Sequence, residues 1–246
     1  MNTQAMTFPR SPIAVALDAP TCADAQRWAV EVAPEVSCLK VGLEVFCRDG
    51  RDAVAAARAG ADEVDCSDTL LFLDLKLHDI PATVAGAVRA LRDIRPDFLT
   101  VHASGGADMI AAACTALPET RITAVTVLTS LTEKDLGVLG IAGSPQDVVV
   151  RWALIAVAAG ARAIVCSPQE VAAVRAAVPR DVVLITPGVR PVGTEAHDQK
   201  RVMTPREAIE SGADLLVIGR PITGAPDRRA AAAAVSKSLL STGFVS

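Results

Sequence analysis

Residues 70–83 read LLFLDLKLHDIPAT, an apolar run that ends in charged side chains and then meets a proline. An apolar run without polar alternation is typical of a parallel strand that is buried on both faces. Side chains two apart in a strand share a face, so Asp74 and Lys76 point one way and the intervening leucines the other. Because leucines suit the packing of helices on a sheet, we expect the charged pair to face the interior of a closed barrel.

Seven similar runs accompany this one along the chain of 246 residues. The eight expected strands are residues 13–17, 38–41, 70–75, 98–101, 122–127, 163–166, 182–185 and 215–218. Helix-forming segments lie between them, among them residues 23–33, 51–59, 82–92, 145–159 and 205–210. Eight alternating strand and helix units over roughly 250 residues indicate a single α/β domain.

Eight such units form either an open doubly wound sheet or a closed (β/α)₈ TIM barrel. The open form is expected to carry a GxGxxG loop after its first strand, but the residues there are Leu17-Asp18-Ala19-Pro20. We therefore predict a TIM barrel over residues 12–246, with a flexible N-terminal segment at residues 1–11. The acidic stretch 62–68 is expected to be a loop on the face opposite the catalytic one.

The composition excludes several classes of function. The net charge is −4 and aromatic residues make up 3% of the chain, so a nucleic-acid-binding surface is not expected. Apolar runs are too short for a membrane span or a signal peptide, which favours a soluble cytoplasmic protein. The six cysteines form no CxxC pair and the three histidines show no metal-ligand spacing, so we expect reduced thiols and no metal site.

Polar residues gather where the predicted strands end, and catalysis in TIM barrels belongs to that rim. Asp18, Lys40, Asp74 and Lys76 sit in or against apolar runs, where an unpaired charge is costly. The stretch 74–79 by itself supports equally a structural ion-pair network and a catalytic lysine between two carboxylates, Asp74 and Asp79. Two flanking carboxylates would keep Lys76 charged, which suits a proton donor better than a Schiff-base nucleophile.

A second group of candidates follows the last two strands. Barrels often bind phosphate there, and the chain offers Arg190 after the seventh strand and Gly219-Arg220 after the eighth. A glycine allows backbone N–H groups to approach a phosphate, and an arginine offers a bidentate fork. The polar stretch 192–200 between them is either a closing loop or an ordinary surface loop.

These motifs together resemble the orotidine 5′-phosphate decarboxylase family of bacterial type. Residues 74–83 match its DxKxxD-I-P-x-T signature. Further segments agree in order: ALD at 16–18, LKVGLE at 39–44, VHASGG at 101–106, AVTVLTS at 124–130, TPGVRP at 186–191, DQKRVMTP at 198–205 and VIGRP at 217–221. The resemblance runs from residue 13 to about residue 240.

The resemblance implies decarboxylation of orotidine 5′-phosphate to UMP in de novo pyrimidine biosynthesis, without cofactor or metal. It implies that Lys76 protonates C6, that Asp74 sits beside the substrate carboxylate, and that Asp79 and Thr83 come from the partner subunit of a homodimer. It also implies ribose contacts from Asp18 and Lys40, pyrimidine contacts from Thr129 and Ser130, and phosphate contacts from Arg190, Gln199, Gly219 and Arg220.

Three other functions fit parts of the pattern. One is a Mg²⁺-dependent keto-sugar-phosphate barrel enzyme, of decarboxylase or aldolase type, that shares the Asp-x-Lys-x-x-Asp core. A Schiff-base aldolase is disfavoured by the two carboxylates beside Lys76. A non-catalytic binder of phosphorylated ligands is disfavoured because a binder has little use for a costly charge cluster.

Overall fold

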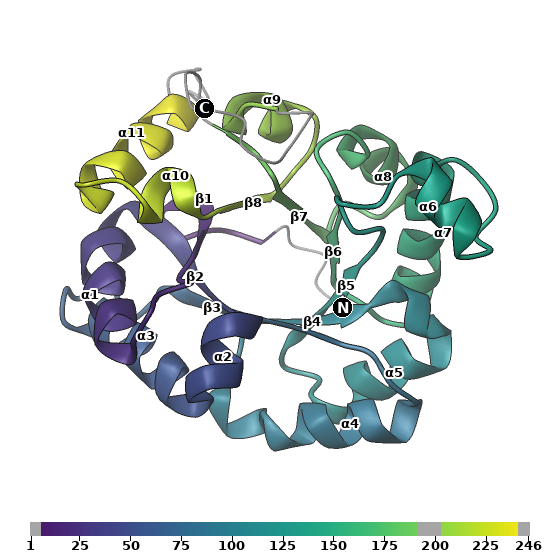
Figure 1. Ribbon diagram of the computed structural model, residues 1–246, viewed down its shortest axis with the longest axis horizontal. Helices are drawn as coiled ribbons and strands as arrows, with labels where there is room; N and C mark the ends of the chain where they lie inside the picture. The colour runs from purple at the N-terminus through teal and green to yellow at the C-terminus, as the bar shows by residue number, and fades with distance from the viewer. Residues whose placement is uncertain (1–5, 191–202, 241–246) are drawn as a thin grey trace.

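The chain folds into a closed ring of eight parallel strands surrounded by helices (Figure 1). The structure is a computed structural model and describes residues 6–190 and 203–240. Each strand pairs with its neighbour in sequence, and β1 closes the ring against β8. The strands are β1 Ser11–Ala16, β2 Val36–Gly42, β3 Leu70–Leu77, β4 Phe98–His102, β5 Arg121–Val125, β6 Ala163–Val165, β7 Val183–Pro187 and β8 Leu215–Ile218. The predicted TIM barrel and all eight of its strands are confirmed.

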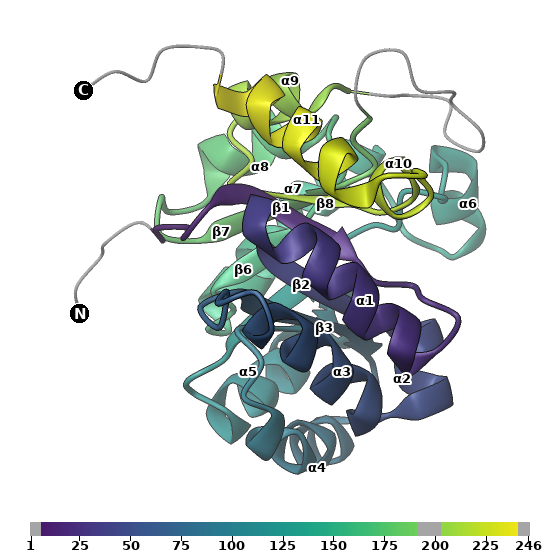
Figure 2. The same cartoon turned by 90° about the vertical axis from the view of Figure 1, so that its left-hand side faces the viewer.

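Helices form the outer layer (Figure 1), and α1 runs alongside α3 (Figure 2). They are α1 Cys22–Val32, α2 Leu43–Asp49, α3 Arg51–Asp62, α4 Pro81–Ala90, α5 Gly106–Ala116, α6 Glu133–Val138, α7 Pro145–Ala158, α8 Val171–Ala177, α9 Pro205–Glu210, α10 Arg220–Thr223 and α11 Arg228–Leu240. Short 3₁₀ turns occupy Ala33–Glu35, Arg92–Ile94 and Ala103–Gly105. Within the described ranges, none of the helices has the length and apolarity that a membrane span requires.

Local sequence explains where several helices begin. The hydroxyls of Thr21 and Ser144 accept hydrogen bonds from the backbone N–H three residues on, which satisfies a donor that the first helical turn leaves unpaired. Thr204 and Glu207 form a reciprocal capping box at α9, and a proline follows the cap there and in α7. Each of these helices therefore begins at a residue that local hydrogen bonds determine, without contacts from residues distant in sequence.

Two apolar cores stabilise the barrel. The larger lies between the strands and the helices, and it includes Leu73 and Leu75 of β3. A smaller cluster fills the inside of the barrel from the N-terminal halves of the strands and contains Ala14, Cys38, Phe72, Phe98, Ala163, Val183, Ile185 and Leu215. Within it the rings of Phe72 and Phe98 meet edge to face with centroids 5.8 Å apart. Ligand space inside the barrel is therefore confined to the C-terminal half of the strands.

The N-terminal boundary differs from the prediction. β1 begins at Ser11, and Arg10 is tied to the barrel: its backbone N–H donates to Ser37 Oγ and its Nε donates to the Val36 carbonyl oxygen. Arg10 also pairs with Asp68, at 2.8 Å. Arg10 and Ser11 thus contact the barrel, and the flexibility of residues 1–11 stays a prediction. Residues 1–5 lie outside the described part of the chain.

The acidic stretch 62–68 contributes Asp68 to the ion pair with Arg10. It begins with the last residue of α3 and leads into the N-terminal end of β3, the end opposite Asp74 and Lys76. The stretch therefore lies on the face away from the charged pair, as predicted.

Replacing Phe98 by alanine should lower the free energy of unfolding by about 3–5 kcal/mol, since the ring is fully buried inside the barrel. Urea denaturation followed by circular dichroism measures the loss. Phe46→Ala, on α2 at the edge of the outer core, is the matched control and should cost clearly less. Equal losses would show that the inner cluster is not a separate source of stability.

Candidate active site

A line of alternating charges crosses the C-terminal ends of the first three strands. Lys76 Nζ donates to Asp74 Oδ1 at 2.8 Å, and Lys40 Nζ lies 3.3 Å from Asp74 Oδ2. Asp18, just past β1, lies 3.9 Å from the same Lys40 ammonium. Three strands thus contribute an acid–base–acid–base sequence, Asp18–Lys40–Asp74–Lys76. Each inner charge has an oppositely charged neighbour on both sides.

The network becomes more buried toward its middle. The side chains of Lys40 and Asp74 are 9% and 14% exposed, whereas Asp18 is 49% exposed. Burial by itself would raise the pKa of the Asp74 carboxyl. The charges of Lys40 and Lys76, with hydrogen bonds from Lys76 and Thr100, outweigh burial and hold that pKa below its usual value. Asp74 is therefore a carboxylate at neutral pH.

The backbone at Lys76 is unusual. Its φ of +51° lies in the left-handed region, which costs a non-glycine residue on the order of 1–3 kcal/mol. At the same place the pairing of β3 with β4 jumps from Leu73↔Leu99 to Leu77↔Val101, which marks a bulge in β3. The predicted shared face of Asp74 and Lys76 is confirmed, since both line one cavity while the leucines pack outward. The arrangement depends on a bulge in β3, which the alternation of side chains in the sequence does not predict.

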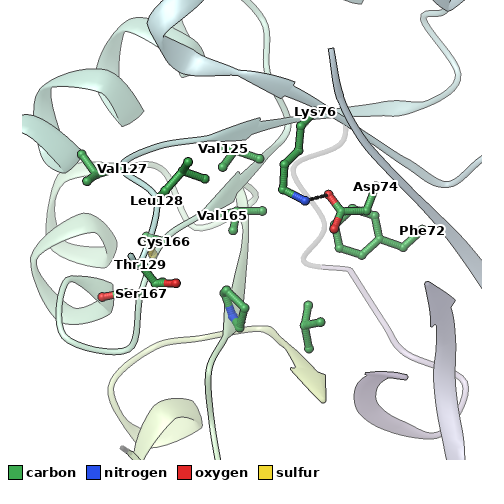
Figure 3. Close-up of a pocket in the computed structure, with 12 residues that line it drawn as sticks. Phe72, Asp74, Lys76, Val125, Val127, Leu128, Thr129, Val165, Cys166 and Ser167 are labelled. Carbon is green, nitrogen blue, oxygen red and sulfur yellow. Dashed lines mark hydrogen bonds and ion pairs between the residues drawn. The ribbon is translucent and has the colours of Figure 1, made fainter. Parts of the chain in front are cut away.

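Asp74 and Lys76 form one wall of a cavity of about 200 Å³ inside the mouth of the barrel (Figure 3). The opposite wall carries Thr129 and Ser167 as polar groups, from the segments that follow β5 and β6. The remaining lining is apolar: Phe72, Val125, Val127, Leu128, Val165, Cys166, Pro187 and Val217. Burial raises the pKa of the Cys166 thiol to about 12, so this sulfur stays protonated and is not a nucleophile. The cavity therefore offers a cation and an anion on one side of a largely apolar chamber.

Of the other predicted residues, Thr129 lines this cavity, whereas Ser130, the next residue of the same exposed turn, is absent from the lining. Gly219 precedes the first turn of α10, where the exposed Arg220 begins the helix. Arg190 follows β7, and its backbone N–H donates to the Met203 carbonyl oxygen.

These two arginine-bearing segments adjoin the cavity because Pro187 of β7 and Val217 of β8, a few residues before them, form part of its lining. Gln199, His197 and the rest of the predicted loop 192–200 lie outside the described residues.

Asp79 and Thr83 are not next to Lys76 within one chain. Both are exposed, and Asp79 Oδ1 accepts a hydrogen bond from the backbone N–H of Ile80. Among the described residues, no ion pair or hydrogen bond joins Asp79 to Lys76. Within a single chain the amine thus contacts one carboxylate rather than the two expected, because Asp79 lies past the end of β3, in the turn into α4.

Two residues that sequence reasoning did not select are part of the site. Thr100 on β4 is completely buried; it accepts from the Lys76 backbone N–H at 2.8 Å and donates to Asp74 Oδ1 at 3.0 Å. Gly42 ends β2, and a Cβ there would lie 2.9 Å from Lys40 Nζ and 3.0 Å from Asp18 Oδ1. Two features of the sequence could have pointed to these residues. Thr100 is a hydroxyl residue inside an apolar strand, and Gly42 follows the strand lysine Lys40 by two residues.

A pair of histidines lies at the same rim. The rings of His78 and His102 have centroids 5.5 Å apart. Burial, then the charges of His78 and Lys76, lower the pKa of His102. His102 is accordingly neutral at pH 7, and it adds no further positive charge beside Lys76.

Known proteins resemble this chain in sequence and in fold. Residues 11–235 match the model of the Orotidine 5′-phosphate decarboxylase / HUMPS family. The chain belongs to this family. A protein named orotidine 5′-phosphate decarboxylase from Thermobifida fusca is 63% identical over 95% of this chain and 97% of its own length. A protein of the same name from Frankia casuarinae is 53% identical over 95% of this chain and 89% of its own.

Solved structures support the same assignment. The crystal structure of orotidine 5′-phosphate decarboxylase from Lactobacillus acidophilus has a TM-score of 0.77 and 31% identity, and covers 94% of this chain and 99% of that one. As a member of this family the chain is an enzyme, a carboxy-lyase. In the described part of the chain, no three His, Cys, Asp or Glu side chains are grouped to hold a metal ion. That the enzyme needs no metal stays a prediction.

Gly42→Ala should displace the Lys40 ammonium from its place between Asp18 and Asp74, because the new Cβ would sit too close to both ends of that ion pair. Lys40 is buried and has little room to move, so we expect the affinity for a nucleotide ligand to fall on the order of 10-fold. Isothermal titration with UMP measures this. Gly86→Ala is the control, since the nearest atom to a Cβ there is the tip of Arg89, at 3.9 Å. Unchanged affinity in Gly42→Ala would remove Lys40 from the ligand site.

Proposed function

We propose that this enzyme decarboxylates orotidine 5′-phosphate to UMP in de novo pyrimidine biosynthesis, with Lys76 as the group that stabilises and protonates C6. One observation carries the proposal: at the wall of the cavity the Lys76 ammonium donates to the buried Asp74 carboxylate, and the Lys40 ammonium pairs with the other oxygen of that carboxylate. The family membership supplies the substrate class, and the charge network supplies the chemistry.

The reaction asks for a fixed cation. When the bond between C6 and the carboxylate breaks, its electron pair stays on C6 while CO₂ leaves, and the pyrimidine ring offers no electron sink for it. An ammonium held against C6 stabilises that pair before the proton moves, which is preorganised electrostatic catalysis. Lys76 then gives one proton to C6, and the neutral amine is reprotonated from solvent. The net change is loss of CO₂ and gain of one proton.

Asp74 has two roles in this scheme. It anchors the ammonium at 2.8 Å, and its own charge is proposed to lie beside the substrate carboxylate. Two carboxylates in proximity repel, and the repulsion disappears once CO₂ has left. The low pKa of Asp74 supports this role, because a protonated carboxyl would neither anchor Lys76 nor repel the substrate.

The rest of the nucleotide is expected to lie along the rim. Asp18 and Lys40 would hold ribose hydroxyls, Thr129 and Ser130 would meet the pyrimidine edge, and the phosphate would reach the β7–β8 corner. That corner provides Arg190, Gly219 and Arg220, together with Gln199, which lies outside the described residues.

The active sites are proposed to be shared between two subunits. Residues 78–83, between β3 and α4, are exposed throughout, and Ile80 is 65% exposed. A single exposed isoleucine is normal on a protein surface, so the proposal that a second subunit covers this segment rests on the family resemblance of residues 74–83. In a homodimer, Asp79 and Thr83 of one subunit would complete the site of its partner. Asp79 would then supply the second carboxylate beside Lys76.

The rival functions are less well supported. A Schiff-base aldolase needs an uncharged lysine, whereas the Lys76 amine donates to a buried carboxylate. A Mg²⁺-dependent enzyme predicts that a chelator stops the reaction. A pure phosphate-ligand binder predicts tight nucleotide binding without turnover.

The direct test is to follow the absorbance of orotidine 5′-phosphate with metal-free protein, with and without EDTA. We expect equal turnover in both. Loss of turnover with EDTA would favour the metal-dependent rival, and absence of turnover in both would favour the binder. Lys76→Ala should lower kcat by at least about 10³-fold while UMP still binds, because both the cation and the proton are lost. Lys237→Ala, an exposed lysine of α11, is the matched control.

Mixing two inactive variants tests the shared site. Lys76→Ala and Asp79→Ala each disable both sites of their own homodimer, but a mixed dimer retains one intact site. After unfolding and refolding an equimolar mixture, random pairing should restore about a quarter of the wild-type activity. No recovery, with mixed dimers shown to form by mass spectrometry, would place Asp79 and Lys76 in the same subunit's site. An active Asp79→Ala homodimer would remove Asp79 from the site altogether.

A further inference from the structure

The hydroxyl of Thr100 joins the two ends of Lys76. It accepts from the Lys76 backbone N–H at 2.8 Å and donates to Asp74 Oδ1 at 3.0 Å, and Asp74 Oδ1 in turn accepts from Lys76 Nζ at 2.8 Å. The three hydrogen bonds form a closed ring that runs from the backbone of Lys76 through two other side chains to its own ammonium.

The direction of each bond in this ring is determined. A carboxylate has no proton to give, so the single hydroxyl hydrogen points to Asp74. The lone pairs of the hydroxyl are then left for the Lys76 N–H. A hydroxyl is a small group that can accept one hydrogen bond and donate another at the same time. A valine side chain has the same shape as threonine but can do neither.

The bulge explains why the ring is needed. The left-handed backbone at Lys76 coincides with the break in pairing between β3 and β4, and there the Lys76 N–H finds a side-chain acceptor on β4. A buried N–H without a partner is costly. The hydroxyl of Thr100 therefore compensates for the ladder bond that the bulge breaks.

We propose that Thr100 is a positioning residue for the reaction: it holds the Lys76 backbone and the Asp74 carboxylate together so that the ammonium is directed at C6. This inference rests on the proposed function for its catalytic consequence, although the hydrogen-bond ring does not. A displacement of about 1 Å at the reacting group can cost on the order of 100-fold in rate.

Removing the hydroxyl also changes the charge balance around Asp74. The charged and titratable groups near this carboxyl are Lys40 on β2, Lys76 on β3 and His102 at the end of β4, with Asp18 beyond Lys40. The hydroxyl is one of the donors that lower the pKa of Asp74. Without it that pKa rises, so the carboxylate is lost at a higher pH as acid is added.

Three variants test the proposal. Thr100→Val keeps the shape and removes the hydroxyl; kcat should fall about 10–100-fold with KM changed less than about 3-fold, and the acid limb of the kcat profile should move to higher pH. Thr100→Ser keeps the hydroxyl and should retain kcat within about 3-fold, with an unmoved acid limb. Thr123→Val is the matched control. Thr123 lies on β5, is equally buried and is in register with Thr100 of β4, and among the described residues its hydroxyl donates to the Arg121 carbonyl oxygen rather than to a side chain of the site.

The proposal is overturned if Thr100→Val retains wild-type kcat, if Thr100→Ser loses as much as Thr100→Val, or if Thr123→Val loses as much. Should Thr100→Val not fold, Thr100→Ala takes its place under the same criteria.

A measurement without substrate distinguishes a failure of the hydrogen-bond ring from a failure of the proposed function. Carbon-13 NMR of the Asp74 carboxyl should show a higher midpoint in Thr100→Val than in wild type, and the Lys76 amide should exchange faster with solvent. If these changes occur while the wild-type protein shows no turnover, the proposed function fails and the ring stands. If turnover is present but neither signal changes, the role of Thr100 fails and the function stands.

Discussion

The carboxylate of Asp74, held between the ammonium groups of Lys40 and Lys76, is the interaction on which the site depends. A lysine and an aspartate inside a barrel are each costly to bury, and neither is tolerable without the other. The charges are compensated because each partner of the Asp74 carboxylate comes from a different strand: Lys40 from β2, Lys76 from β3 itself, and the hydroxyl of Thr100 from β4. The same contacts that keep the charges buried also hold the amine in one place.

Closure of the barrel brings the ends of its first and last strands together at the rim. β1 pairs with β8, and Val15 is in register with Ile218. Asp18 and Arg220 follow these paired residues within three positions, so the first strand's acid and the last strand's arginine come to the same part of the rim. A charge network that begins at β3 thus extends toward the β7–β8 corner, and one phosphorylated nucleoside is proposed to bridge them.

Several departures from regular geometry fall within the site. The left-handed Lys76, the bulge in β3 and the tight approach at Gly42 all lie within the charge network. Away from it, Asp65 and Arg95 are also left-handed and β1 also carries a register shift. Strain persists where the surrounding structure over-determines it, and functional sites are where it gathers. The family membership fits this pattern, since the matches cover nearly the whole chain and the unusual geometry falls on the DxKxxD segment.

The sequence by itself determined the barrel, the order of its strands and the shared face of Asp74 and Lys76, because apolar runs and side-chain alternation are properties of neighbouring residues. Tertiary structure alone decided the bulge, the partner hydroxyl of Thr100, the clearance at Gly42 and the attachment of Arg10 to the barrel. It also decided that, among the described residues, no ion pair joins Asp79 to Lys76 within one chain, and that Asp79 instead accepts from the Ile80 N–H. These features depend on the register between strands distant in sequence, and register is set only when the whole ring closes.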